Sequence, residues 1–174
     1  MKWDQQGVAV NEYLQSVSNP AVYAAGDAAA SGAPRLTPVA AYHGRIVATN
    51  LLDEQNRQST DHTIVPSVVF TIPPLASVGL LESVARHRGL AFDVRHGDTA
   101  SWYSSRRVGE THAGFKLLVE KPSGRILGAH VLGPHADDLI NIFAIAMRTG
   151  ATASSLKEIL FAYPSAGSDI PYMV

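Results

Sequence analysis

The pattern of hydrophobic and polar positions is clearest between residues 37 and 51. Residues of one helical face recur there every three or four positions: Val39, Tyr42, His43, Ile46, Val47, Asn50 and Leu51. This spacing predicts a helix of about four turns with one packing face. Thr37 is expected to cap the helix, and Pro38 to take its first position, where a missing backbone N–H costs nothing.

The segment before this helix combines short apolar runs with turn residues. Residues 7–10 are typical of a short strand, and residues 21–25 form a compact apolar run that suits a buried strand. Gly26 and Asp27 end that run, and a glycine-rich loop over residues 30–34 leads to the helix.

A polar stretch over residues 53–61 (DEQNRQSTD) has the composition expected at a domain boundary. We therefore expect a linker over residues 53–63, which joins a first unit of residues 1–52 to a second unit of residues 64–174.

The second unit alternates in the manner of strands and is interrupted by short helices. Strands are predicted at residues 67–72, 92–96, 115–120 and 126–132. The last two flank Pro122, Ser123 and Gly124, which indicates a hairpin. Helices are predicted at residues 81–85, 136–148 and 155–161. The second helix is apolar on most faces, so we expect it to be largely buried, and the third begins with capping-box spacing at Ser155. This order predicts an α+β fold with an antiparallel sheet flanked by helices.

Composition narrows the classes of partner. The chain has 174 residues, of which 46% are hydrophobic and 17% charged, as in packed globular proteins. A formal net charge of −1 provides no basic surface for nucleic acid or an anionic membrane. No apolar run approaches the ~20 residues that cross a bilayer, and the N-terminus lacks a signal-peptide pattern. We therefore expect a cytoplasmic protein with neither nucleic-acid nor membrane partners.

The chain contains no cysteine, which removes disulfides, thiolate metal ligands and a cysteine nucleophile. His130 and His135 are not accompanied by the carboxylates that would complete a metal site, so no metal is expected.

Three segments carry a resemblance to a known family. Residues 19–27 (NPAVYAAGD) are similar to an FAD motif in which a strand ends in Gly-Asp. Residues 36–41 (LTPVAA), with Gly44 and Arg45, are similar to a flavin-facing helix. Residues 66–174, which include GAHVLG at 128–133, are similar to a dimerisation domain. In this order the segments resemble the pyridine nucleotide–disulfide oxidoreductases, the superfamily of glutathione, mercuric and dihydrolipoamide reductases.

The resemblance implies an organisation and an activity. Residues 1–52 would be the C-terminal remnant of an FAD-binding domain, and residues 64–174 would form a homodimer. The chain would be part of an FAD-dependent oxidoreductase that passes electrons from NAD(P)H through flavin to an acceptor, as glutathione reductase does.

The resemblance also implies a cofactor site. Glycine allows close backbone approach and a carboxylate accepts hydrogen bonds, so Gly26 and Asp27 would meet the ribityl chain of FAD. The helix start would face the pyrimidine edge of the flavin, because its free N–H groups and dipole favour negative charge there. Its residues are Thr37, Pro38, Val39 and Ala40. Val39 and Ala40 are the expected donors, since proline has no N–H.

The chain departs from the family in two ways. It lacks the first glycine-rich FAD motif, the NAD(P) fingerprint and the redox cysteine pair, which belong to N-terminal domains missing here. We therefore expect the chain alone to bind FAD weakly or not at all. Tyr163 also takes the place of a catalytic histidine, and Ser168 that of a glutamate, with Asp169 one residue later.

Tyrosine has an ordinary pKa of about 10 and is poorly matched to proton transfer at neutral pH, which puts a disulfide substrate in doubt. Tyr163 and Asp169 are the candidate catalytic residues, with Tyr163 either a hydrogen-bond donor or a packing residue at the dimer contact. Two other interpretations remain open. One is a non-catalytic dimerisation or interaction module, and the other is a flavoprotein reductase of a quinone or a metal ion.

Overall fold

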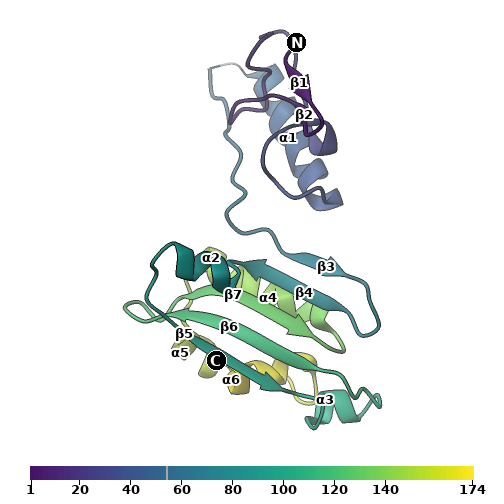
Figure 1. Cartoon of the computed structure of the whole chain (residues 1–174), viewed down its shortest axis with the longest axis vertical. Helices are drawn as coiled ribbons and strands as arrows, with labels where there is room; N and C mark the ends of the chain where they lie inside the picture. The colour runs from purple at the N-terminus through teal and green to yellow at the C-terminus, as the bar shows by residue number, and fades with distance from the viewer. Residues whose placement is uncertain (54) are drawn as a thin grey trace. The chain divides into compact units, whose positions relative to one another are not determined.

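The computed structural model describes residues 1–53 and 55–174. The chain forms two compact units, Met1–Thr63 and Ile64–Val174, each with its own core (Figure 1). The described helices are not long and apolar enough for any of them to cross a membrane.

The first unit is built around one long helix. Strands β1 (Trp3–Asp4) and β2 (Gly7–Val8) pair antiparallel, and a short 3-10 helix η1 (Gly26–Ala28) precedes α1 (Thr37–Leu52). The predicted helix is present over its full length, and its buried residues are Val39, His43, Ile46 and Asn50. A small apolar cluster of Leu14, Ala24, Ala29 and Ile46 forms the core.

Two local predictions for this unit are wrong. Residues 21–25 do not form a strand, because Tyr23 makes only an isolated bridge to Gln15 and no neighbouring strand extends the pairing. Thr37 does not cap α1; it is already the first helical residue, and Leu36 occupies the cap position without a side-chain hydrogen bond. Pro38 consequently follows as the second helical residue rather than the first.

The segment that we expected to be a linker packs within the first unit. The buried side chain of Asn50 donates to the Gln58 carbonyl at 2.9 Å and accepts from the Gln58 N–H at 2.7 Å. The Thr60 N–H donates to the Glu12 carbonyl at 2.8 Å. These backbone contacts tie the polar stretch to α1 and to the N-terminal loop, so the compact unit extends to Thr63.

The second unit contains a five-stranded antiparallel sheet in the order β3-β4-β7-β6-β5. Its strands are β3 (Ser67–Val69), β4 (Leu75–Gly79), β5 (Phe92–Asp98), β6 (Gly114–Glu120) and β7 (Ile126–Leu132). The predicted hairpin is confirmed as β6 and β7. Strand β3 is shorter than predicted, and β4, which we did not predict, separates it from β7.

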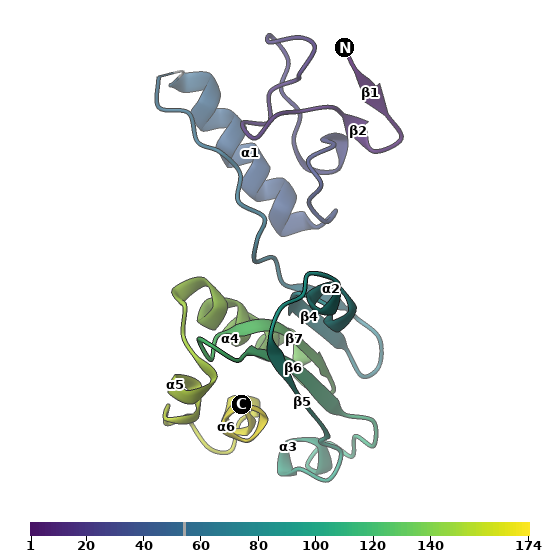
Figure 2. The same ribbon diagram turned by 60° about the vertical axis from the view of Figure 1, so that its left-hand side comes forward.

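Helices cover both faces of this sheet. Figure 2 shows α4 (Ala136–Thr149), α5 (Ala153–Lys157) and α6 (Ile170–Met173) on one side and α2 (Glu82–His87) on the other. Leu117 and Ala129 face α4 within the main core, together with Phe143 of that helix. Because strand side chains alternate, Lys116 and His130 point to the α2 side. Two further short helices are α3 (Tyr103–Arg106) and η2 (Ala166–Asp169).

The C-terminal helices differ from the sequence predictions in two respects. Ile145 of α4 is 63% exposed, so this helix is buried on one face only, although Gly150 ends it as predicted. The capping box lies at Thr152 and Ser155, at the start of α5, and residues 159–161 are not helical. Ser155 and Glu158 repeat the same spacing three residues later, so the sequence pattern places the box one turn too far along the chain.

Candidate cofactor site

The turn at Gly26 and the start of α1 line the same cavity, although ten residues separate them in the chain. The cavity has a volume of about 390 Å³. Its lining residues are Ala25, Gly26, Asp27, Arg35, Leu36, Thr37 and Ala40. The fold therefore brings together the two segments from which the sequence predicted a cofactor site.

Gly26 is required by the geometry of this turn. Its φ of +58° lies in the left-handed region, and a Cβ atom there would lie 2.9 Å from the Cβ of Ala40. The next residue, Asp27, is exposed, and its carboxylate has no hydrogen-bond or ion-pair partner among the described residues. The turn thus packs its backbone against α1 and leaves the carboxylate available at the cavity.

The first turn of α1 has free donors, but they are not the pair expected. The Ala40 N–H donates to the Leu36 carbonyl at 3.0 Å, so it is not a free donor. Within the described part of the chain, the N–H groups of Thr37 and Val39 have no acceptor. Pro38 has no backbone N–H. Two aligned N–H groups at the positive end of a helix dipole favour an electron-rich ligand edge.

A buried histidine accepts a hydrogen bond from the backbone of the Gly26 turn. The Gly26 N–H donates to Nδ1 of His43 at 3.1 Å, and Nε2 of His43 lies 2.7 Å from Nε2 of His62. His43 is fully buried, and burial, followed by the neighbouring His62, lowers its pKa below the ordinary value. The helical pattern included His43, but nothing in the polar run around His62 pointed to this contact.

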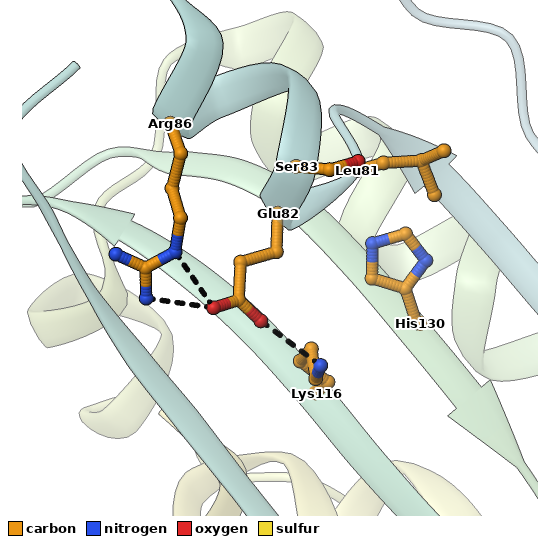
Figure 3. Close-up of a pocket in the computed structure, with 6 residues that line it drawn as sticks. All are labelled: Leu81, Glu82, Ser83, Arg86, Lys116 and His130. Carbon is orange, nitrogen blue, oxygen red and sulfur yellow. Dashed lines mark hydrogen bonds and ion pairs between the residues drawn. The ribbon is translucent and has the colours of Figure 1, made fainter. Parts of the chain in front are cut away.

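A second cavity, of about 530 Å³, lies between α2 and the sheet (Figure 3). Glu82 accepts two hydrogen bonds from Arg86, at 3.0 and 2.7 Å, and one from Lys116 at 3.0 Å. The Arg86 hydrogen bond, and then that of Lys116, lowers the pKa of Glu82. Because one carboxylate already satisfies both cations, this cluster attaches α2 to strand β6 and is a poor site for an added ligand.

The two candidate catalytic residues lie around one small depression near the C-terminus. Tyr163 is 76% exposed, and its ring centre lies 6.0 Å from that of Tyr103. Asp169 instead accepts a hydrogen bond from the Ser104 hydroxyl. Burial raises the pKa of Asp169, and the Ser104 hydrogen bond opposes that shift. The cavity that both residues line measures only about 10 Å³, so they form neither a direct pair nor a ligand-sized site.

Potential metal ligands do not gather among the described residues. In the parts that the structure covers, residues 1–53 and 55–174, no group of three or more histidine, cysteine, aspartate or glutamate side chains is placed to hold an ion.

The fold and the sequence together define the class of protein. Residues 65–174 match the family model described as "Pyridine nucleotide-disulphide oxidoreductase, dimerisation domain". The chain belongs to this family. The match confirms the predicted family and the α+β fold with its antiparallel sheet.

Individual relatives are of two lengths. The chain is 46% identical to the "Uncharacterized 19.7 kDa protein in mercuric resistance operon" of Staphylococcus aureus, covering 98% of this chain and 94% of that protein. It is 36% identical to the mercuric reductase of Streptomyces lividans, covering 90% of this chain and 32% of the reductase. It is 40% identical to the mycothione reductase of Mycobacterium tuberculosis, covering 87% of this chain and 33% of the reductase.

A solved structure shows the same relation. The HOCl-induced flavoprotein disulfide reductase RclA from Escherichia coli superposes with a TM-score of 0.87 at 28% identity, covering 99% of this chain and 39% of RclA. The chain thus spans between 32% and 39% of these three reductases and 94% of the shorter staphylococcal protein.

Proposed function

We propose that this chain is part of an FAD-dependent oxidoreductase, in which electrons pass from NAD(P)H through flavin to an acceptor. The chain would supply the flavin-facing turn and helix start, together with the dimer interface. The cavity shared by Gly26, Asp27 and the first turn of α1 is the observation that carries this proposal. It combines a close backbone approach, a carboxylate and the free N–H of Thr37 in one place, while Val39 is not among its lining residues.

The side chains and amides of the cavity suit one part of FAD. Asp27 would accept hydrogen bonds from the ribityl hydroxyls, and the N–H groups of Thr37 and Val39 would face the pyrimidine edge. Flavin, when bound, accepts a hydride and passes the electrons on. The pyrophosphate and nicotinamide sites would come from domains that this chain does not contain, so its own affinity for FAD should be low.

The second unit is proposed to form a homodimer. On α4, Ile145 is 63% exposed, while the opposite face of the helix packs in the core. Leu160 and Tyr163 on the following segment are 98% and 76% exposed. Exposed apolar patches commonly mark surfaces that another protein covers, and the interface is proposed to include these side chains.

A flavin titration followed by amide NMR tests the proposed site in the whole chain. Riboflavin, which carries the ring and the ribityl chain only, should shift the amides of Gly26, Asp27, Thr37 and Val39, with weak affinity. Asp27→Asn should weaken this binding, whereas the matched surface change Asp93→Asn should leave it unaltered. If saturating riboflavin shifts none of these amides, or shifts those around Glu82 instead, the proposed cofactor site is wrong.

The same titration separates the non-catalytic alternative. A dimerisation or interaction module with a vestigial flavin segment would form dimers in light scattering but would show no flavin-dependent shift in the first unit. Flavin-dependent shifts at Asp27 would exclude that interpretation.

Tyr163 favours a second proposal about the acceptor. An exposed phenol that meets no carboxylate among the described residues does not reproduce a histidine–glutamate dyad, so the acceptor would be a quinone or a metal ion rather than a disulfide. The naming of two relatives after mercuric resistance and mercuric reduction is consistent with a metal ion. The deciding measurement is NAD(P)H oxidation by the flavoenzyme that contains this chain, with a disulfide, a quinone and mercuric ion offered separately. Turnover of the disulfide alone would refute this choice of acceptor.

A further inference from the structure

His43 and His62 form a directional chain of hydrogen bonds that starts at the candidate cofactor turn. The Gly26 N–H can only donate, so Nδ1 of His43, 3.1 Å away, must be unprotonated. A neutral His43 therefore carries its proton on Nε2. That proton points to Nε2 of His62 at 2.7 Å, which must accept it, so a neutral His62 carries its own proton on Nδ1.

We propose that His43 is a positioning residue for the turn at Gly26 and Asp27, and that His62 holds His43 in the one tautomer that can do this. The inference rests on the proposed function in that it gives the turn a role in flavin binding. Its structural content, a proton-dependent anchor for the Gly26 amide, stands on the hydrogen bonds alone.

A proton added to either ring breaks the chain of hydrogen bonds. A protonated His43 would direct an N–H at the N–H of Gly26, and a protonated His62 would direct one at the N–H of His43. Full burial of His43 adds the cost of desolvating the charge, and burial and His62 both lower its pKa. The anchor therefore requires both rings to be neutral.

Other titratable groups lie near the pair in the described part of the chain. Tyr42 lies beside both imidazoles, with ring centres 6.1 and 6.2 Å away, and its hydroxyl accepts the Asp61 N–H at 2.9 Å. The carboxylates of Asp27 and Asp61 adjoin Gly26 and His62 in the chain. The Asp61 carboxylate accepts hydrogen bonds from the N–H and the hydroxyl of Thr63.

A metal ion between the two rings does not fit the same geometry. A metal at Nε2 of His43 requires a lone pair there, yet Nδ1 already uses its lone pair for the Gly26 amide. Only an imidazolate could do both. The pair is therefore a hydrogen-bonded anchor and not a two-histidine metal site.

The test uses the whole chain without flavin. Long-range ¹H–¹⁵N NMR at about pH 7.5 should show His43 protonated on Nε2 and His62 on Nδ1. Exchange protection of the Gly26 amide, corrected for its intrinsic pH dependence, should fall about tenfold once the pH drops below the lowered pKa of His43, as expected for one lost hydrogen bond. Protonation of His43 on Nδ1 at the higher pH would overturn the inference.

Substitutions separate an anchor from a general packing role. Oδ1 of asparagine lies near the position of Nδ1, so His43→Asn should keep the Gly26 amide protected and make that protection independent of pH. His43→Leu, which preserves bulk only, should leave the amide unprotected both above and below that pKa. His62→Gln retains an acceptor for the Nε2 proton of His43. Equal protection in the Asn and Leu variants would contradict the proposal. The exchange measurements contain no flavin. A negative riboflavin titration would therefore refute the proposed cofactor site without affecting the result for His43.

Discussion

Replacement of Gly26 by alanine tests the geometry on which the candidate cofactor site depends. The residue has a φ of +58°, where an L side chain costs about 1–2 kcal/mol. The new Cβ would also lie 2.9 Å from the Cβ of Ala40, and overpacking of this kind typically costs about 1–3 kcal/mol. We expect Gly26→Ala to lower the free energy of unfolding of the first unit by about 2–5 kcal/mol.

A double-mutant cycle isolates the contact from the backbone strain. Ala40→Gly alone should cost about 1 kcal/mol, because it places glycine in a helix. In the double variant the collision is gone, so its loss should be smaller than the sum of the single losses by about 1–3 kcal/mol. The strain at φ remains. Gly44→Ala is the matched control: nothing lies within 4 Å of a Cβ there, and alanine should stabilise α1 by up to about 1 kcal/mol.

Native-state amide exchange at Ile46 and Asn50, both buried in α1, reports the stability of the first unit without interference from the second. Additive effects of Gly26→Ala and Ala40→Gly, within about 0.5 kcal/mol, would refute the argument that the Ala40 contact requires glycine at this turn. A destabilising Gly44→Ala would show that α1 does not follow ordinary helix propensity.

Three further predictions concern the remaining contacts. Asn50→Ala removes the side chain that joins α1 to the polar stretch. The free energy of unfolding should fall by roughly 1–3 kcal/mol for each buried polar group left unpaired, as measured by the same amide exchange. A smaller loss would mean that water replaces the side chain. Burial lowers the pKa of His43. At about pH 6.5 the unfolded chain therefore binds a proton at His43, whereas the folded chain does not. Stability of the first unit should therefore be complete above that pH and decline as the pH falls toward the lowered pKa, and a urea series with His43→Asn should show a flatter profile. Ile145→Glu should convert the dimer to monomer in light scattering. The control Ile72→Glu changes a 99% exposed position of the β3–β4 connection and should leave the dimer intact. The reverse result would place the interface on the β3–β4 hairpin.

Local features were predictable because they depend on neighbouring residues. The periodicity of residues 37–51 specifies α1, since the residues of one helical face recur every three to four positions. The β6–β7 hairpin follows from two alternating runs around a short turn, and Gly150 ends α4 because it adopts a left-handed conformation. The Gly-Asp turn could be proposed as a cofactor contact only through a resemblance, because Gly-Asp occurs in many turns.

Long-range contacts decided what the local pattern could not. The composition of β4 does not favour a strand. Its pairing with β7 depends on close packing, since a Cβ on Gly128 of β7 would lie 2.1 Å from the Leu80 carbonyl oxygen. The polar stretch before Thr63 reads as a linker, yet its backbone hydrogen bonds fold it onto α1.

The sequence alone is sufficient to identify the family, the two long helices, the hairpin and the two segments of the candidate site. Two features become visible only in the fold: which N–H groups at the start of α1 remain free, and the contact of His62 with His43. The physical reason is that hydrogen bonds between distant residues depend on three-dimensional approach, and residue spacing along the chain does not encode that approach.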